Sequence, residues 1–124
     1  MKTLLVTLVL LAATPMATAE PPGSGVGRVG GRYLIDVRTA GEYAGGHVEG
    51  AILIPYDEIG ARIAGVVTDK SAPIALYCRS GRRSGLALAT LSALGYTRVE
   101  NLGGVDDAQQ RVAALRECVE RREC

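Results

Sequence analysis

The residues best suited to chemistry lie in one short segment. It begins with a cysteine, contains one glycine and three arginines, and reads Cys78-Arg79-Ser80-Gly81-Arg82-Arg83-Ser84. The thiolate is the nucleophilic form of cysteine, and guanidinium groups and the amino end of a helix both favour its formation. A loop that contains glycine can also direct its backbone N–H groups at an anion. The segment therefore predicts a nucleophilic Cys78 with a lowered pKa, in a loop that binds an anionic substrate.

A structural interpretation of the same segment has to be weighed beside this one. A lone cysteine at the end of a strand is often a small buried apolar residue, and arginines on a loop are often only solvated. The cysteine, the glycine and the three arginines fall within seven residues, directly before a helix. That coincidence favours the functional interpretation.

The segments around this loop predict strands that alternate with helices. We expect strands at 33–38, 51–55, 74–77 and 98–102, helices at 57–64, 84–94 and 105–119, and a helical turn at 39–43. Thr39, Asp57 and Ser84 are the expected N-caps. This alternation favours a parallel sheet covered by helices, hence an α/β domain. In such sheets the ligand site lies beyond the carboxyl ends of the strands, where Cys78 follows 74–77.

Length and charge limit the protein to one domain without a general affinity for polyanions. The chain has 124 residues, is 48% hydrophobic and carries a formal net charge of +1. Lys2 is the only charged residue before Glu20, so thirteen basic residues balance thirteen acidic ones in the rest. We therefore expect no nucleic-acid partner and no binding to an anionic membrane surface.

The amino-terminal residues predict an export signal. Lys2 precedes the apolar run 4–13, and small residues follow at Ala17 and Ala19. The apolar run is shorter than the roughly 20 residues that cross a bilayer, so we expect no stable membrane anchor. The predicted organisation is a cleaved signal at 1–19, a flexible Gly/Pro leader at 20–31, a folded domain at 32–119 and a tail at 120–124. A periplasmic location follows from this interpretation.

Several motifs, in this order along the chain, together resemble the rhodanese-like sulfurtransferases, in particular their small exported single-domain type. The motifs are Leu34-Ile35-Asp36-Val37-Arg38, Glu42-Tyr43, Gly46-His47-Val48-Glu49-Gly50-Ala51, Ile54-Pro55, the 78–84 loop with Gly85, Gly95-Tyr96, and Val99-Glu100-Asn101-Leu102-Gly103-Gly104. The resemblance implies a three-layer α/β/α fold with a short parallel sheet of about four strands.

The resemblance also implies a reaction. Cys78 would take the outer sulfur of thiosulfate, release sulfite, carry the sulfur as a persulfide and pass it to cyanide or a thiol. Arg79, Ser80, Gly81, Arg82, Arg83 and Ser84 would form the substrate-binding loop, and no metal or organic cofactor is implied. The sequence does not decide which of the three arginines binds the substrate.

The chain departs from the family in two places. Many members have a further strand and helix before the Asp-Val-Arg strand, where this chain has only the leader, so one sheet edge is expected to be less protected. Val105 stands where a Trp is common. The loss of this packing anchor is expected to loosen the last helix.

The remaining candidate residues favour structural roles. Asp36 and Arg38 are expected to form an ion pair or cap that supports the neighbouring loop. His47 is expected to satisfy backbone groups. Cys118 and Cys124 are a candidate disulfide, which requires the last helix to unwind after about Val119, because six helical residues rise too far for a bridge. Too few other ligands accompany these two cysteines for a metal site.

Two other functions remain open. A Cys-dependent phosphatase or arsenate reductase also combines a cysteine, a tight anion loop and an arginine at a helix start. Here, however, Ser84 occupies the position of the phosphatase arginine, and Tyr77 precedes Cys78 where phosphatases usually have His. The second alternative is a non-catalytic sulfur carrier or interaction module, which the presence of Cys78 leaves open.

Overall fold

The structure is a computed structural model that describes residues 27–123. The expected signal at 1–19, most of the expected leader and Cys124 lie outside the described residues. The elements in chain order are β1 (Arg28–Val29), β2 (Arg32–Asp36), α1 (Ala40–Ala44), β3 (Ile52–Leu53), α2 (Ile59–Arg62) followed by a 3-10 turn (Ile63–Gly65), β4 (Ile74–Tyr77), α3 (Arg82–Ala93), β5 (Val99–Asn101) and α4 (Val105–Arg121).

The sheet has five strands, in the order β1-β2-β4-β5, with β3 also paired to β2. The strands β2, β3, β4 and β5 are parallel, as expected, whereas β1 pairs with β2 in the antiparallel direction. The expectation of about four strands therefore missed β1. The strands β1 and β3 divide one edge of β2, because β1 pairs with Arg32 and Tyr33 and β3 pairs with Ile35 and Asp36.

The hairpin of β1 and β2 shows that the predicted leader extended too far. Its turn is Gly30-Gly31, and both glycines have positive φ, +57° and +79°. Glycine adopts such angles without steric cost, which allows the tight reversal. From the sequence alone, this pair of glycines is typical of a flexible linker. Residues 28–31 belong to the folded domain instead.

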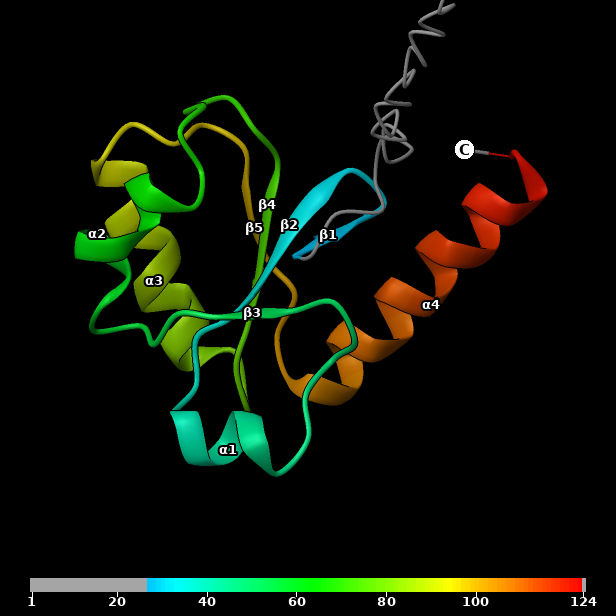
Figure 1. Ribbon diagram of the computed structural model, residues 1–124, viewed down its shortest axis with the longest axis horizontal. Coiled ribbons are helices and arrows are strands. Elements are labelled where there is room, and N and C mark those ends of the chain that lie inside the picture. The colour runs from blue at the N-terminus through cyan, green and yellow to red at the C-terminus, as the bar shows by residue number, and fades with distance from the viewer. Residues whose placement is uncertain (1–26, 124) are drawn as a thin grey trace, which may run out of the picture.

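Apolar side chains alternate between the two faces of the sheet, so the core has two halves. Ile35 and Leu76 face α2 and α3, whereas Leu34 and Ala75 face α4. All four residues of β4 are buried, as expected for a central strand. Figure 1 shows α2 and α3 on one side of the sheet and α4 on the other, which makes the three layers.

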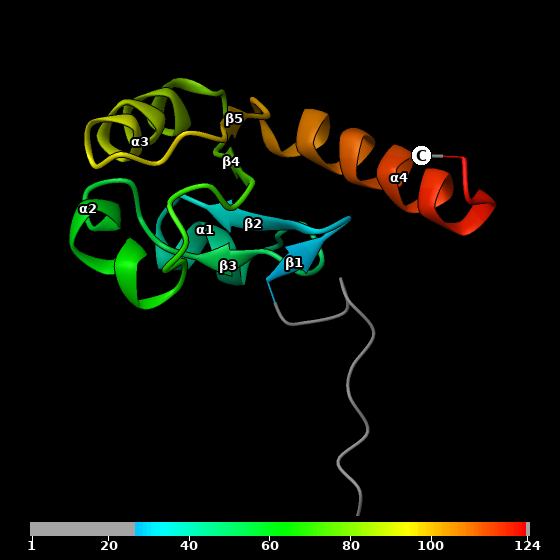
Figure 2. The ribbon, with the colours of Figure 1, turned by 90° about the horizontal axis from the view of Figure 1, so that it is seen from above.

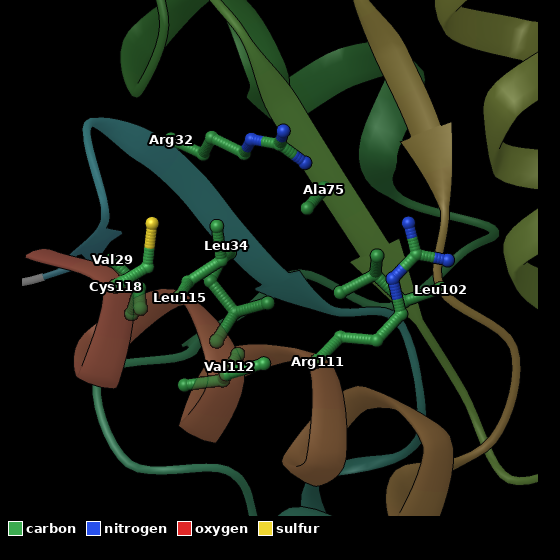
Figure 3. A pocket seen from close by; sticks show the side chains of 10 residues that line it. Val29, Arg32, Leu34, Ala75, Leu102, Arg111, Val112, Leu115 and Cys118 are labelled. Atoms are coloured by element: carbon green, nitrogen blue, oxygen red, sulfur yellow. The ribbon is translucent and has the colours of Figure 1, made fainter. Parts of the chain in front are cut away.

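The fully buried residues of helix α4 lie in its first half. Its buried residues are Ala108 and Val112, and Figure 2 shows its second half running past the sheet. Beside it lies a pocket of about 310 Å³. As Figure 3 shows, Leu34 and Ala75 contribute to this pocket from the sheet and Leu115 from the helix.

The end of α4 also differs from the expected domain boundary. The helix continues to Arg121, two residues beyond the expected end at 119, so residues 120 and 121 belong to the helix and not to a tail. Its C-cap is Arg122, whose φ of +56° is left-handed. Within residues 27–123, no helix is long and apolar enough to cross a membrane.

Candidate active site

Cys78 lies where β4 ends and the loop that starts α3 begins. Its N–H donates to the carbonyl of Gly103, at 3.1 Å, which ties the loop to the segment after β5. Gly81, with a φ of +90°, is the N-cap of α3. The expectation that Ser84 caps this helix was wrong. Ser84 lies in the first turn, buried, and its hydroxyl is 3.5 Å from the Cys78 sulfur.

The sulfur of Cys78 is surrounded by hydrogen-bond donors. The N–H of Gly81 donates to it at 2.9 Å. Burial raises the pKa of Cys78, but hydrogen bonds from the Ser84 hydroxyl and from the N–H groups of Ser84, Ser80 and Gly81 outweigh it and lower the pKa from 9.0 to about 7. A substantial fraction of Cys78 is therefore thiolate at neutral pH. The chief stabilisers are hydrogen bonds at the sulfur, and they include backbone N–H groups of the kind expected from the sequence, whereas the guanidinium groups expected beside them are not among the main causes.

The three arginines of the loop have different surroundings. Arg83 forms a two-pronged ion pair with Glu42 of α1, at 2.8 and 2.9 Å. The guanidinium of Arg83 lowers the pKa of Glu42 to about 2, so this carboxylate is charged at neutral pH. Arg79 and Arg82 are exposed, and neither has an ion-pair partner in the part of the chain that the structure describes.

Hydrogen bonds with Thr39 hold Glu42 in place for its ion pair with Arg83. The Thr39 hydroxyl accepts the N–H of Glu42, and the Glu42 carboxylate accepts the N–H of Thr39, which together form a capping box. This confirms Thr39 as the cap of α1. The expected cap at Asp57 was wrong, because the N-cap of α2 is Glu58, which makes no side-chain cap bond.

Asn101 links the loop to β5, a role that the sequence analysis did not assign. Its side-chain nitrogen donates to the Gly81 carbonyl at 3.0 Å, and its oxygen accepts the Ser84 hydroxyl at 2.7 Å and the Gly103 N–H at 2.9 Å. The available signal was its place at the end of the strand next to β4, where parallel strands bring their carboxyl ends together.

Two glycines allow the segment after β5 to pack against the cysteine loop. A Cβ on Gly81 would lie 3.2 Å from the Cα of Gly103, and one on Gly104 would lie 2.8 Å from the Arg79 carbonyl. Any side chain at Gly104 would push the two segments apart. The Gly-Gly pair after β5 is thus part of the support for the sulfur loop.

Asp36 and Arg38 form a buried ion pair at the carboxyl end of β2. The Arg38 guanidinium donates to Asp36 at 2.7 to 3.0 Å and to the Gly46 carbonyl at 2.7 Å. His47 is exposed, its Nδ1 lies 2.9 Å from the Tyr43 carbonyl, and its ring stacks on Tyr43 at 3.6 Å. These contacts hold the connection between α1 and β3.

The other cysteines lie apart from this loop. Cys78 is a free thiol, whereas Cys118, on α4, is disulfide-bonded. Cys124 is outside the described residues, so the Cys118–Cys124 pairing stays a prediction. Among residues 27–123, no group of three or more His, Cys, Asp or Glu side chains could hold a metal ion.

Comparison with known proteins identifies the family. The model of the rhodanese-like domain matches residues 25–110. The chain belongs to the rhodanese-like family. It is 42% identical over 103 residues to thiosulfate sulfurtransferase PspE of Escherichia coli, covering 83% of this chain and 88% of that one. It is 41% identical over 71 residues to a sulfurtransferase of Allochromatium vinosum, covering 57% of this chain and 64% of that relative.

Solved structures agree with this assignment. A rhodanese with anions from E. coli has a TM-score of 0.60 and 49% identity, over 61% of this chain and 89% of that one. A human single-domain sulfurtransferase has a TM-score of 0.54 and 27% identity, over 61% and 78%. The chain is therefore a sulfurtransferase with the rhodanese-like α/β fold that its motifs predicted.

Proposed function

We propose that the protein is a thiosulfate sulfurtransferase that carries sulfur on Cys78 as a persulfide. The Cys78 thiolate attacks the outer sulfur of thiosulfate, the S–S bond of thiosulfate breaks, and its electron pair leaves with sulfite. Cyanide or a thiolate then attacks the terminal sulfur. Breaking the new S–S bond restores the Cys78 thiolate and releases thiocyanate or a persulfide of the acceptor.

The observation that carries this proposal is the set of donors at the sulfur. The N–H groups of Ser80, Gly81 and Ser84, with the Ser84 hydroxyl, all lower the pKa of Cys78. Preorganised donors of this kind stabilise negative charge on sulfur, which is the charge present in both the thiolate and the persulfide.

We assign substrate binding to Arg79 and Arg82. Arg83 is neutralised by Glu42, whereas the other two guanidiniums are exposed on the loop and suited to the oxygens of a small anion. Replacing either one by Gln is expected to raise the KM for thiosulfate, whereas Arg83→Gln is expected chiefly to lower the free energy of unfolding. A raised KM in Arg83→Gln, with an unchanged KM in the other two variants, would contradict this assignment.

The phosphatase alternative has less support from the loop. Six residues after Cys78, where a phosphatase places its arginine, the chain has the buried Ser84 facing the sulfur. The arginine before it, Arg83, is held by Glu42. No guanidinium thus occupies the position from which a phosphatase grips its phosphate.

Mass spectrometry of the purified protein tests the proposal. Incubation with thiosulfate is expected to add the mass of one sulfur atom to the wild type and nothing to Cys78→Ser, and cyanide is expected to remove it with release of thiocyanate. A wild type of unchanged mass would reject the persulfide. Sulfur uptake without transfer to cyanide or a thiol would indicate a carrier. Hydrolysis of p-nitrophenyl phosphate without sulfur uptake would favour the phosphatase.

We also propose that residues 1–19 direct export to the periplasm, on the basis of their charge, apolar run and small residues. In a bacterial host that secretes through the same type of signal, the periplasmic protein is expected to begin at Glu20. An uncleaved chain found only with the cytoplasmic fraction would contradict export.

A further inference from the structure

Asn101 ends β5, and its side-chain amide lies between the two segments that meet at Cys78. Its hydrogen bonds determine which way the amide points, because the Gly103 N–H can only donate and the Gly81 carbonyl can only accept. The oxygen of the amide must therefore face Gly103, and the nitrogen must face Gly81. In this orientation the same oxygen also faces the hydroxyl of Ser84, at 2.7 Å.

The Ser84 hydroxyl has two acceptors but only one proton. It is 2.7 Å from the Asn101 oxygen and 3.5 Å from the Cys78 sulfur. A hydroxyl can donate fully to one acceptor at a time, and the amide oxygen is a strong acceptor whereas the sulfur of a neutral thiol is a weak one, so the proton goes to Asn101. While Cys78 is a protonated thiol, its sulfur therefore faces a lone pair of Ser84, which can accept a hydrogen bond from the thiol.

We propose that Asn101 is a positioning residue for the sulfur chemistry: it holds the Ser84 proton away from Cys78 and so controls how readily that sulfur ionises. When the thiol loses its proton, the Ser84 hydroxyl rotates from Asn101 to the thiolate. Asn101 then keeps its bonds to Gly103 and Gly81, so the loop keeps its shape. The inference rests on the proposed role of Cys78 as the sulfur carrier.

The side-chain amide of Asn101 is hydrogen-bonded to Ser84, Gly81 and Gly103 and to no charged side chain in the described structure, so we expect the charged groups near Cys78 to stay in place when Asn101 is replaced. Arg83 interacts electrostatically with Cys78 and is paired with Glu42 of α1. The loop also carries the exposed Arg79 and Arg82. Other charged and titratable groups at this end of the sheet include Asp36 and Arg38 of the β2 end, Tyr56 after β3, Tyr77 of β4, and Asp106 and Asp107 at the start of α4.

A double-mutant cycle between Asn101 and Ser84 tests the proposal. The pKa of Cys78 is measured from the ultraviolet absorbance of the thiolate, with Cys78→Ser as the baseline and no sulfur donor present. Asn101→Leu, which removes the competing acceptor, is expected to lower the pKa by about one unit, a change of about tenfold in thiolate well below the pKa. Ser84→Ala is expected to raise the pKa. In the Ser84→Ala background, Asn101→Leu is expected to change nothing.

Three results would overturn the role of Asn101. The first is an unchanged Cys78 pKa in Asn101→Leu, and the second is a raised Cys78 pKa in that variant. The third is an equal lowering of the Cys78 pKa when Asn101→Leu is made in the Ser84→Ala background. Asn101→Asp is the second variant should the leucine prevent folding. Its carboxylate is expected to hold the Ser84 proton more tightly and to raise the Cys78 pKa more with Ser84 present than in Ser84→Ala. Equal rises in both backgrounds would show only the added charge and reject the proposal.

These measurements separate this inference from the proposed function. Failure of the wild type to gain sulfur from thiosulfate would reject the persulfide and leave the coupling between Asn101 and Ser84 measurable. Sulfur uptake without that coupling would reject the role of Asn101 alone. Thermal unfolding of the same variants measures the structural role of Asn101. If Asn101 only supported the loop, replacing it would lower the melting temperature, but its effect on the Cys78 pKa would not depend on Ser84.

Discussion

Replacement of Gly81 by Ala tests how the backbone of the loop controls Cys78. The φ of Gly81 is +90°, in the left-handed region, where an alanine costs about 1–2 kcal/mol. The added Cβ would lie 3.2 Å from the Cα of Gly103, so one of the two backbones must move by a few tenths of an ångström. We therefore expect Gly81→Ala to reduce the free energy of unfolding by about 2 kcal/mol.

The same movement acts on the sulfur. The Gly81 N–H donates to the Cys78 sulfur at 2.9 Å. A hydrogen bond to a charged group contributes about 1.5–3 kcal/mol, and 1.36 kcal/mol corresponds to one pKa unit, so complete loss of this bond would raise the pKa by about 1–2 units. Since the pKa of Cys78 starts at about 7, the thiolate fraction at pH 7 would fall by about 5- to 50-fold.

Gly95→Ala is the matched control. Gly95 follows α3 with a φ of +93°, and a Cβ there would meet nothing within 4 Å. The control therefore carries the same backbone strain without a clash and without a bond to sulfur. Urea unfolding and titration of the Cys78 thiolate are measured on both variants. If Gly81→Ala and Gly95→Ala lost equal stability and neither shifted the Cys78 titration, the proposed control of sulfur by the loop backbone would be wrong.

Three further predictions concern pH and packing. Sulfur uptake by Cys78 is expected to fall about tenfold per pH unit below about pH 7 and to level off above it, because only the thiolate attacks; a rate independent of pH across this range would contradict the lowered pKa. The pKa of Glu42 is lowered by Arg83 from 4.5 to about 2, so this pair stabilises the fold above about pH 4.5 and is lost as the pH falls toward 2. Glu42→Gln is expected to remove this part of the acid dependence and to cost about 1 kcal/mol or less at neutral pH, measured by chemical unfolding at several pH values. Ala114→Leu adds apolar volume to the pocket beside α4 and is expected to raise the free energy of unfolding by about 0.5–1 kcal/mol. The control, Ala89→Leu on α3, is expected to leave the free energy of unfolding nearly unchanged. Equal effects of the two substitutions would show that the pocket does not limit the packing of α4.

Local sequence was sufficient for the strand and loop that carry Cys78. The expected strand at 74–77 coincides with β4, because a short apolar run between Pro73 and Cys78 has few alternatives to a buried central strand. The start of α3 was placed two residues late. The expected cap was the Ser84 side chain, whereas the helix begins after Gly81, whose backbone conformation provides the turn.

Contacts between distant parts of the chain could not be predicted in this way. Glu42 and Arg83 are 41 residues apart, and Asn101 is 17 residues from Ser84. Neither pair has a periodic pattern that would reveal it. The strand β1 was missed for another reason, because its partner is adjacent but the turn glycines, Gly30 and Gly31, also occur in linkers.

The structure separates two roles that the sequence assigned to the same arginines. A buried sulfur is stabilised as a thiolate by donors in direct contact with it, and here those are N–H groups and the Ser84 hydroxyl. Arg79 and Arg82 are exposed, so water and salt screen their effect on that sulfur, while an anion that binds at the loop can still contact them directly. If Arg79 and Arg82 bind the sulfur donor as proposed, ionisation of Cys78 and recognition of the donor depend on different groups. Such a division would let the loop keep a reactive thiolate before any substrate has bound.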